Sequence, residues 1–563
     1  MNVVIIGGVA GGATAAARLR RLDEQANIIV LERTGYVSYA NCGLPYYVGG
    51  VITDREKLTL QTPESFRERF NIDVRVKNEV TAIDRKAKTV AVRRLDDGSE
   101  YSLPYDKLVL SPGAHAIMPK IPGIDSDRLF TLRTVEDTYA ISDYIEQNKP
   151  DTATIIGAGF IGMEMAENLS ERGIDVTIVQ RDPHVMPTFD ADMTSMIHYQ
   201  IRSNGVRLHL NSLVTGFESD ADSISTLVEG RDPIKSDFAI MAIGVLPEST
   251  LASDAGLELG MRGSIKTDDH MRTSDPDIYA VGDAVEVESV ATHEPALIAL
   301  AGPANKQGRI AADNIAGIDS RFAGSQGSSV MKLFEETVAS TGITCEAAEA
   351  AGIDYGYVLL SPANHATYYP KASAISLKVV FEKPTGRILG AQAIGRDGVE
   401  KRIDVVATAM RANMTADDLT ELDLTYAPPY SAAKDPVNMA GYMIQDILTG
   451  LVKQMSWDEA LACEDAHILD VRTDRERSKG HIEGAQHIPL DSLRERIEEV
   501  PKDGKLLLVH CTTGLRSYIA CRILSQLGYD CVNIAGGYLF YDHINIDRTI
   551  TKRDYAPCGL PLS

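Results

Sequence analysis

The chain has 563 residues, and at about 150 residues per domain this length predicts three or four domains. Its 44% hydrophobic and 24% charged residues are typical of a globular protein, and the net charge of −23 argues against binding to nucleic acid or an anionic membrane surface. No apolar run is long enough to span a bilayer, and the N-terminus enters a predicted strand too early for a signal peptide. We therefore expect a cytoplasmic protein that contacts neither nucleic acid nor membrane, although a local cationic patch can still hold a small anion.

The seven cysteines are few for this length and odd in number, which predicts free thiols rather than a disulfide framework. Cys42 and Cys511 each follow a predicted strand and are the candidates for reactivity. The cysteines interpreted as structural are Cys345, Cys463, Cys521 and Cys531. Cys558 lies in a Pro-rich end and repeats the Cys-Gly-Leu-Pro sequence that begins at Cys42; chance similarity is favoured over a mobile carrier of sulfur or electrons.

The first residues predict a dinucleotide-binding βαβ unit. A buried strand at residues 3–6 leads into a glycine-rich turn and a helix, and a second strand ends at Glu32. Gly7 permits the tight turn, Gly12 lets the helix approach the sheet, and the helix N-terminus can receive a pyrophosphate. Glu32 is placed to accept a hydrogen bond from a ribose hydroxyl. Val9 replaces the middle glycine of the fingerprint, so a βαβ unit that binds no phosphate stays the alternative.

A second βαβ unit has the complete fingerprint. A strand at residues 154–156 is followed by Gly157, Gly159, Gly162 and then Glu164, and the next strand ends at Gln180 and Arg181. An acid at that strand end would favour the free 2′-hydroxyl of NAD, whereas Arg181 can accommodate the 2′-phosphate of NADP, so the choice stays open. Two βαβ units in one chain, each with strand, glycines and helix in the same order, are unlikely to be a chance match to the dinucleotide-binding pattern.

Further segments complete these two units. Residues 108–114 and 239–244 are predicted strand-to-turn pieces that end at Gly113 and Gly244. Asp283 follows a buried strand at the start of a predicted helix, where it either caps the helix or holds a ligand hydroxyl; capping is the commoner role for an isolated Asp.

From about residue 322 the sequence predicts an α+β region. Residues 375–381 alternate like a half-buried antiparallel strand, and helices are expected at 402–412 and 416–421. Two segments, 364–370 and 424–430, are rich in tyrosine, and exposed aromatic packing is the default interpretation for both.

The last part of the chain again alternates strands and helices. Strands are predicted at 468–472 and 506–510, and the second leads into Cys511 and a helix that reaches about Leu527. Backbone N–H groups and the helix dipole at such a junction favour a thiolate, and Arg516 adds a cation nearby.

Cys42 lies in the segment 38–47, directly after the second strand of the first βαβ unit. A thiol at the mouth of a dinucleotide-binding crevice is placed for thiol–flavin chemistry. The alternative is a buried structural cysteine, since free Cys is among the most buried residue types.

These motifs resemble a known family. Residues 1 to about 445 resemble the single-cysteine flavoprotein disulfide reductases of the coenzyme A-disulfide reductase type, within the pyridine nucleotide-disulfide oxidoreductase family, and residues 456–541 resemble a rhodanese domain. The segments that carry the resemblance are Gly7–Gly12, Ser38–Tyr47, Gly157–Gly162, Val281–Asp283, Ala301–Asn305, Tyr368, Tyr426, Asp470–Arg472, Gly480–Ala485 and Cys511–Ser517.

The resemblance implies an α/β protein with two Rossmann-like dinucleotide-binding domains of the glutathione reductase type, an α+β dimerisation domain and a C-terminal rhodanese-like α/β domain. The expected bounds are 1–114 with 248–321 for an FAD-binding domain, 115–247 for an NAD(P)-binding domain, 322–445 for dimerisation, 446–455 for a linker, 456–541 for the rhodanese domain and 542–563 for a tail.

The resemblance also implies roles for individual residues. FAD would lie along Gly7, Gly11, Gly12, Glu32, Gly113, Asp283 and Ala301. NAD(P)H would lie along Gly157, Gly159, Gly162, Glu164, Gln180, Arg181 and Gly244, and CoA would contact Arg18, Arg21, Ser38 and Asn41. Cys42 would attack and form a mixed disulfide with CoA, Cys511 with Arg516 would accept sulfane sulfur, and Tyr368 and Tyr426 would reach the site from the other subunit of a homodimer.

The implied activity is NAD(P)H-dependent reduction of CoA persulfide, polysulfide or CoA disulfide through Cys42, with persulfide favoured because a sulfurtransferase loop has no evident use in disulfide reduction. No second cysteine lies a few residues from Cys42, so the sulfur of the substrate or of a bound CoA must complete the cycle. One alternative is an NAD(P)H oxidase or peroxidase that uses a Cys42 sulfenic acid, although Ala10 replaces the histidine of those relatives. Another is a flavin redox sensor whose rhodanese-like module only docks a partner. The sulfur donor and the route from Cys511 to Cys42 stay open.

Overall fold

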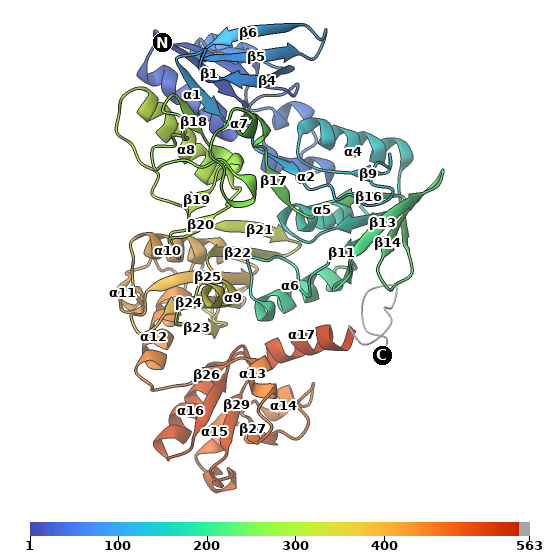
Figure 1. Ribbon diagram of the computed structural model, residues 1–563. Helices are drawn as coiled ribbons and strands as arrows, with labels where there is room; N and C mark the ends of the chain where they lie inside the picture. Colours follow the sequence, from blue (N-terminus) through green and yellow to red (C-terminus); the bar gives the residue numbers. More distant parts are fainter. Residues whose placement is uncertain (551–563) are drawn as a thin grey trace. The chain divides into compact units, whose positions relative to one another are not determined.

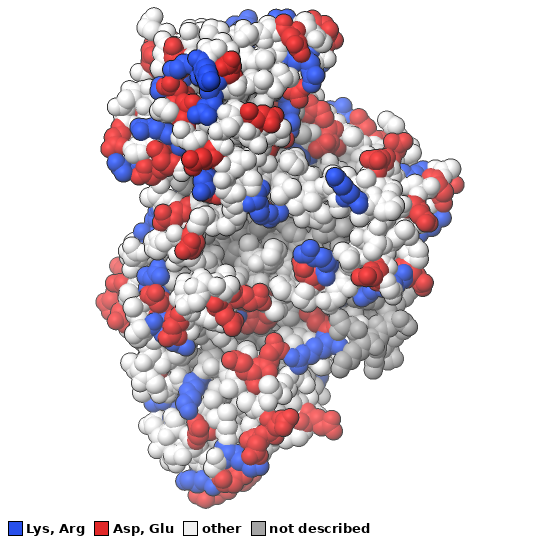
Figure 2. Space-filling view, in the orientation of Figure 1, with Lys and Arg blue, Asp and Glu red and all other residues white. Residues whose placement is uncertain are grey.

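The computed structural model describes residues 1–550, which form two compact units (Figure 1). The first unit contains residues 1–181 and 211–327, and the second contains residues 182–210 and those from 328 onward. Among the described residues, no helix is both long and apolar enough to cross a membrane. Acidic and basic side chains are interspersed over the face shown in Figure 2.

The first unit contains a parallel sheet with the strand order β18-β7-β1-β2-β3. Its strands are β1 (Asn2–Ile6), β2 (Asn27–Leu31), β3 (Asp73–Arg75), β7 (Lys107–Leu110) and β18 (Ile278–Ala280). Helices α1 (Ala10–Leu22) and α8 (Ala301–Ile315) pack closely together, because a Cβ atom on Gly308 of α8 would lie 2.3 Å from the carbonyl oxygen of Gly11 in α1. The apolar strand predicted at residues 3–6 is therefore the buried centre of this sheet.

A second parallel arrangement in the first unit places β11, β10, β16 and β9 side by side in that order. These strands are β9 (Leu129–Phe130), β10 (Thr152–Ile156), β11 (Asp175–Val179) and β16 (Phe238–Met241), and the accompanying helices are α4 (Val135–Asn148) and α5 (Phe160–Glu171). Residues 153–156 are buried. The two parallel arrangements match the two βαβ units that the glycine-rich turns predict.

Smaller elements complete the first unit. The antiparallel groups are β4 (Asn78–Asp84), β5 (Thr89–Arg94) and β6 (Glu100–Pro104); β13 (Val214–Ser219), β14 (Ile224–Val228) and β15 (Ile234–Ser236); β8 (Ala114–Ala116) with β17 (Val245–Pro247); and β19 (Val287–Glu288) with β20 (Pro295–Ala296). The short helices are α2 (Leu44–Val48), α3 (Pro63–Phe70) and α7 (Thr250–Asp254).

The second unit contains an antiparallel sheet with the order β21-β22-β25-β24-β23. Its strands are β21 (Ser329–Leu333), β22 (Glu336–Gly342), β23 (Tyr355–Leu360), β24 (Ile375–Glu382) and β25 (Ile388–Gly395). The helices of this part are α6 (Ala191–Ser203), α9 (Cys345–Ala350), α10 (Val399–Arg411), α11 (Ala416–Glu421) and α12 (Pro436–Leu448), and β12 (Arg207–His209) follows α6.

The expectation that residues 375–381 form a half-buried strand is wrong, because β24 is buried on both faces. Lys378, which lies between the alternating apolar positions of this strand, has a side chain that is only 5% exposed. Its ammonium group lies 3.0 Å from Asp190 and 2.9 Å from Asp192 at the start of α6. The two ion pairs stabilise the buried ammonium group. The local sequence around residue 378 does not indicate partners that lie so far away in the chain.

The remainder of the second unit is built on a parallel sheet with the order β26-β30-β29-β27-β28. Its strands are β26 (Gln454–Met455), β27 (Ala466–Asp470), β28 (Gln486–His487), β29 (Leu506–His510) and β30 (Cys531–Ile534), and its helices are α13 (Trp457–Leu461), α14 (Asp474–Arg477), α15 (Leu490–Leu493), α16 (Leu515–Gln526) and α17 (Gly537–Ile550). The strands and the helix predicted around Cys511 are present.

Helix α17 continues through residues 542–550, which we expected from the sequence to be part of a tail. Asp547 of this helix lies 2.7 Å from His198 of α6 and also pairs with Arg202, and both of these partners are 2% exposed. This buried contact stabilises the end of the helix, so the expected boundary at residue 542 does not mark the end of regular structure. Cys558 lies outside the described residues.

A buried ion pair holds together the two tyrosine-rich segments of the second unit. The guanidinium of Arg402 lies 2.9 Å from the carboxylate of Asp435, and the two side chains are 1% and 3% exposed. Arg402 also donates to the carbonyl oxygen of Asn364, in the first segment, and to the hydroxyl of Ser431, which directly follows the second. One side chain thus fixes the bases of both segments.

We expect Asp435→Asn to lower the free energy of unfolding by about 3–5 kcal/mol, because it leaves the buried charge of Arg402 unpaired. Urea unfolding followed by circular dichroism measures the loss. As a matched control, Asp530→Asn removes an exposed partner of Lys453 and should cost less than about 1 kcal/mol. Equal losses in the two variants would contradict the assigned role of Arg402.

Candidate active sites

A cavity of about 810 Å³ lies in the first unit at the carboxyl ends of four strands of the β18-β7-β1-β2-β3 sheet. Gly7 follows β1, Glu32 follows β2, Ser111 follows β7 and Gly282 closely follows β18, and all four residues line the cavity. Ala301, at the start of α8, lines it as well. Ligands of parallel α/β sheets bind at this edge, so the cavity is the first candidate site.

The glycine-rich turn at this cavity needs two of its glycines for steric reasons. Gly7 has φ +92°, and a Cβ atom there would lie 2.0 Å from the carbonyl oxygen of Ser111. A Cβ atom on Gly12 would lie 1.9 Å from the carbonyl oxygen of Gly7. Val9 has φ −97°, a value open to any residue, which explains how the turn forms without the middle glycine of the fingerprint.

Glu32 is buried and braces the glycine-rich turn. One carboxylate oxygen accepts the N–H of Gly8 at 2.9 Å, and the other accepts the N–H and the hydroxyl of Thr34, each at 2.9 Å. The carboxylate still lines the cavity, where its predicted role towards a ribose hydroxyl stays a prediction.

Asp283 does not cap a helix. It lies in a single 3₁₀ turn, Gly282–Ala284, without a side-chain cap, and its carboxylate accepts from the guanidinium of Arg133 at 2.5 Å. Arg133 also donates to the carbonyl oxygen of Ala114, so the pair joins two parts of the cavity wall. Gly113 lies beside them with φ +74°.

Cys42 lies in a 3₁₀ turn, Asn41–Gly43, directly before α2; its thiol is accessible and lines the cavity. The structure therefore contradicts the alternative of a buried structural cysteine. Partial burial raises the pKa of the Cys42 thiol, and the negative charges of Glu164 and Asp283 raise it further. The positive charge of Arg133 lowers it in part. The chain by itself thus favours the protonated thiol, and a thiolate needs stabilisation from a bound group.

The second glycine-rich turn repeats the steric pattern of the first. Gly157 has φ +99°, and a Cβ atom on Gly162 would lie 2.1 Å from the carbonyl oxygen of Gly157. Gln180 follows β11 and accepts the N–H of Ala158 at 3.1 Å, as Glu32 accepts that of Gly8. Also here are Gly159, whose Cβ would meet open space, Gly244 after β16, and Arg181, which is exposed after Gln180.

Glu164 connects this second turn to the region of Cys42. It lies near the start of α5, which contacts the short helix α2 that follows Cys42. Burial and the neighbouring Glu167 raise the pKa of Glu164 to about 7, although a hydrogen bond from Tyr46 of α2 lowers it. This carboxyl group can therefore take up or release a proton near neutral pH.

The four residues assigned to CoA fall into two groups. Ser38 and Asn41 line the cavity beside Cys42, and Asn41 Oδ1 is a buried acceptor without a partner among the described residues. Arg18 instead pairs with Asp313 at 2.7 Å, and Arg21 lies over the ring of Phe70 at 5.6 Å. The CoA roles of all four stay predictions.

Two tyrosines of the second unit form a hydrogen-bonded pair. The hydroxyl groups of Tyr368 and Tyr426 lie 2.9 Å apart, although the residues are 58 positions apart in the chain. They are 75% and 48% exposed, and the mutual hydrogen bond raises the pKa of Tyr368. Two exposed phenol groups held together in this way are available to a ligand or to another chain.

Cys511 lies between β29 and α16, as predicted, and is 1% exposed. Its sulfur accepts the N–H of Gly514 at 3.1 Å and the hydroxyl of Ser517 at 3.5 Å. Arg516 projects from the first turn of α16, and its guanidinium is engaged by Glu476 of α14 at 2.7 and 2.6 Å. The loop therefore supplies a sulfur atom surrounded by donors and a cation with an anionic partner.

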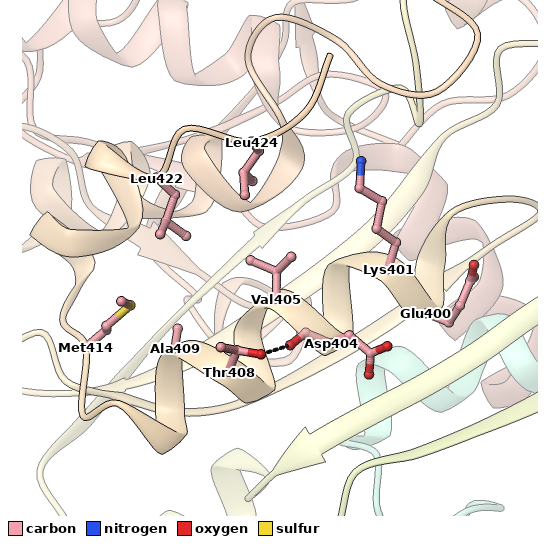
Figure 3. Close-up of a pocket in the computed structure, with 9 residues that line it drawn as sticks. All are labelled: Glu400, Lys401, Asp404, Val405, Thr408, Ala409, Met414, Leu422 and Leu424. Carbon is pink, nitrogen blue, oxygen red and sulfur yellow. Dashed lines mark hydrogen bonds between the residues drawn. The ribbon is translucent and has the colours of Figure 1, made fainter. Parts of the chain in front are cut away.

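A further pocket of about 570 Å³ lies in the second unit along α10. In Figure 3, Val405 points towards Leu422 and Leu424, and Lys401 lies at the rim. The nine residues that line it include no cysteine or histidine, so this apolar groove is not a candidate for the chemistry of the other sites.

Family models match three parts of the chain. The pyridine nucleotide-disulphide oxidoreductase model matches residues 1–308, the dimerisation-domain model of that family matches 329–436, and a rhodanese-like domain matches 452–541. The chain belongs to the pyridine nucleotide-disulphide oxidoreductase family. Its predicted family, enzyme class and fold class, with the added rhodanese domain, are thereby confirmed.

Members of this oxidoreductase family with related sequences are known. The chain is 38% identical over 449 residues to a coenzyme A disulfide reductase of Staphylococcus haemolyticus (strain JCSC1435), which covers 79% of this chain and 100% of the relative. The structure of reduced Bacillus anthracis CoADR-RHD is 47% identical with a TM-score of 0.93, over 96% of this chain and 98% of that one. A NAD-dependent persulfide reductase from A. fulgidus is 39% identical with a TM-score of 0.92, over 96% and 100%.

Sequence reasoning missed two residues of this oxidoreductase that the structure brings to the candidate sites. Arg133 and Glu476 each act on a predicted residue from a distant part of the chain. Glu476 lies between the motif segments Asp470–Arg472 and Gly480–Ala485. This position was the one indication in the sequence that it belongs to the rhodanese site. Arg133 gave no such signal, because its partner Asp283 is set by tertiary structure alone. Tyr46 lies inside the predicted segment 38–47, but its hydrogen bond to Glu164 was not predicted.

We expect Glu164→Gln to lower the pKa of the Cys42 thiol, because the substitution removes a nearby negative charge. At pH 8 or above, where Glu164 is ionised, alkylation of Cys42 by iodoacetamide in the reduced enzyme should be about three- to tenfold faster than in the wild type. At pH 6 Glu164 is mostly protonated, and the difference should disappear. Mass spectrometry of the Cys42 peptide measures the rates.

Glu68→Gln serves as the control, since it removes an exposed carboxylate of α3 in the same unit. It should leave the alkylation rate of Cys42 unchanged at both pH values. An equal rate increase in the two variants would show that Glu164 has no specific influence on Cys42.

Proposed function

We propose that this chain is an FAD-dependent enzyme that uses NAD(P)H to reduce CoA persulfide, polysulfide or CoA disulfide through Cys42. Its rhodanese domain accepts or delivers sulfane sulfur through Cys511. One observation carries the proposal: an accessible thiol lines a large cavity at the carboxyl edge of a dinucleotide-binding sheet, in a chain that also contains a rhodanese-like domain.

The cavity of the first unit fits FAD. The N-terminus of α1 and the glycine-rich turn present backbone N–H groups suited to a pyrophosphate, and Glu32 and Asp283 supply carboxylates for hydroxyl groups. Asn41 Oδ1 is a buried acceptor in need of a donor. The second glycine-rich turn, with Gln180 and Arg181 at the strand end, would hold NAD(P)H in the same manner.

The domain division expected from the sequence supports these assignments and stays part of the proposal: FAD at 1–114 with 248–321, NAD(P)H at 115–247, dimerisation at 322–445 and the rhodanese domain at 456–541. The groove along α10 and the exposed tyrosine pair lie in the proposed dimerisation domain.

Cys42 carries out the sulfur chemistry. Its thiolate attacks the sulfur of CoA persulfide that is bonded to CoA; a mixed disulfide with CoA forms, and the bond to the terminal sulfur breaks and releases hydrosulfide. When bound, FAD with NAD(P)H supplies the electron pair that cleaves this mixed disulfide and regenerates the thiolate. Glu164, with a pKa of about 7, holds or releases a proton close to Cys42.

Tyr368 and Tyr426 serve the site of the other subunit in a homodimer. Each chain exposes the hydroxyl pair, and phenol O–H groups can donate to a departing thiolate. A homodimer would thus complete two sites, each with one cysteine and one tyrosine pair. Small sulfur compounds and CoA are the proposed partners of these sites.

We expect Cys42→Ser to abolish anaerobic NAD(P)H oxidation with CoA persulfide, CoA disulfide and polysulfide, because it removes the nucleophile for all three. Cys511→Ser should retain these activities and lose only sulfur transfer from a bulkier donor. Absorbance of the reduced nicotinamide measures turnover. Cys463→Ser, which changes a thiol outside both sites, is the control and should behave as wild type.

Equal loss of activity in the Cys42 and Cys511 variants would contradict this division of labour. Faster oxidation of NAD(P)H by dioxygen or peroxide than by any sulfur compound would favour the oxidase alternative. Negligible turnover with every acceptor would favour a redox sensor.

A further inference from the structure

Glu476 of α14 forms a closed network across the Cys511 loop. Its two carboxylate oxygens accept from the two terminal nitrogens of Arg516 at 2.7 and 2.6 Å. The hydroxyl of Thr512 donates to the same carboxylate at 2.7 Å, and Thr473 donates its N–H at 3.0 Å and its hydroxyl at 2.7 Å. Arg516 is therefore held in a bidentate pair with Glu476.

The network pairs the guanidinium that lies near the Cys511 sulfur, because both terminal nitrogens of Arg516 donate to the Glu476 carboxylate. Hydrogen bonds from Arg516, Thr512 and Thr473 hold the pKa of Glu476 far below its usual range, so the carboxylate is ionised at neutral pH and cancels the charge of Arg516.

Two further arginines of this domain share a single carboxylate. Arg472 and Arg477 both contact Asp470, at 2.8 and 3.5 Å. Burial lowers the pKa of His510, the residue before Cys511, to about 4, so its imidazole is neutral. Arg516 thus has the Glu476 carboxylate to itself, whereas Arg472 and Arg477 share that of Asp470.

Two exposed apolar side chains lie on the helix that follows the loop. Leu515 and Ile519 lie four residues apart on α16, on one face of the helix, and are 59% and 37% exposed. They flank Arg516 in the sequence and follow Cys511 closely. An apolar rim of this kind favours the carbon chain of an organic donor over a strongly hydrated inorganic anion.

We propose that Glu476 selects the sulfur donor of Cys511: by occupying Arg516 it makes the loop accept sulfane sulfur from the persulfide of an organic thiol and reject an inorganic dianion such as thiosulfate. This inference rests on the proposed sulfur-accepting role of Cys511 and names the donor class of that site.

The transfer step is balanced without an added oxidant or reductant. The Cys511 thiolate attacks the terminal sulfur of the donor RS–SH; a bond forms between the two sulfur atoms, and the bond within the donor breaks. The donor thiolate RS⁻ leaves with the electron pair, and the proton stays on the transferred sulfur. The N–H of Gly514 and the hydroxyl of Ser517, which now donate to Cys511, lie where they can stabilise the new persulfide.

The test compares two donors, glutathione persulfide and thiosulfate, with the full-length holoenzyme under anaerobic conditions. The readout is the rate at which the Cys511 peptide gains one sulfur atom, measured by alkylation and mass spectrometry. In the wild type, glutathione persulfide should load Cys511 at least about tenfold faster than thiosulfate. Glu476→Gln should accelerate loading by thiosulfate about tenfold or more, and change loading by glutathione persulfide less than about threefold.

Two further variants test the mechanism. Adding Arg516→Gln to Glu476→Gln should remove the gain with thiosulfate, because the gain depends on the released guanidinium. Glu499→Gln breaks a bidentate pair with Arg496 on the same domain and should leave both rates unchanged.

The inference is overturned if wild-type Cys511 takes sulfur from thiosulfate as fast as from glutathione persulfide, or if Glu476→Gln keeps persulfide loading and gains nothing with thiosulfate. If Glu476→Gln fails to fold, competition in the wild type decides: thiosulfate should not slow loading by glutathione persulfide, and competitive inhibition would overturn the inference. Failure of the proposed function looks different, since Cys511 would then gain sulfur from neither donor.

Discussion

The contact of one glycine with the carbonyl of another sets the geometry on which the first unit depends. Gly12 can lie against the carbonyl oxygen of Gly7 because it has no Cβ, and Gly162 lies against Gly157 in the same way. This contact brings the N-terminus of each helix to the carboxyl edge of its sheet, where backbone N–H groups can receive a phosphate. The cavity lies at the first of these edges, and Cys42, in a separate turn, lines its wall.

The two candidate thiols are placed in opposite surroundings. Cys42 is accessible, and the carboxylates of Glu164 and Asp283 act against its ionisation. Cys511 is buried, but a backbone N–H and a hydroxyl donate directly to its sulfur. A thiol whose ionisation depends on a bound flavin is suited to electron transfer. A thiol whose sulfur accepts hydrogen bonds from fixed donors is suited to holding a transferred sulfur atom.

Local patterns predicted much of this structure, and long-range contacts account for what they missed. The glycine-rich turns, the strands that precede them and the Cys511 loop depend on neighbouring residues, so they could be read from the sequence. The burial of Lys378 depends on Asp190 and Asp192, nearly 190 positions away, and was not foreseen. Of the two interpretations left open for Asp283, capping is excluded, and its partner Arg133, 150 positions away, could not be predicted from the sequence.

The pairing of Asp547 with His198 and Arg202 bears on how such a fused protein can arise or be shortened. His198 accepts the N–H of Val185 on one ring nitrogen and contacts Asp547 through the other, so its neutral form suits both partners. A chain cut before α17 would remove the carboxylate that pairs with Arg202 and uncover the face of α6 on which α17 packs. The last helix of the rhodanese module therefore also stabilises a helix that precedes it by more than 300 positions.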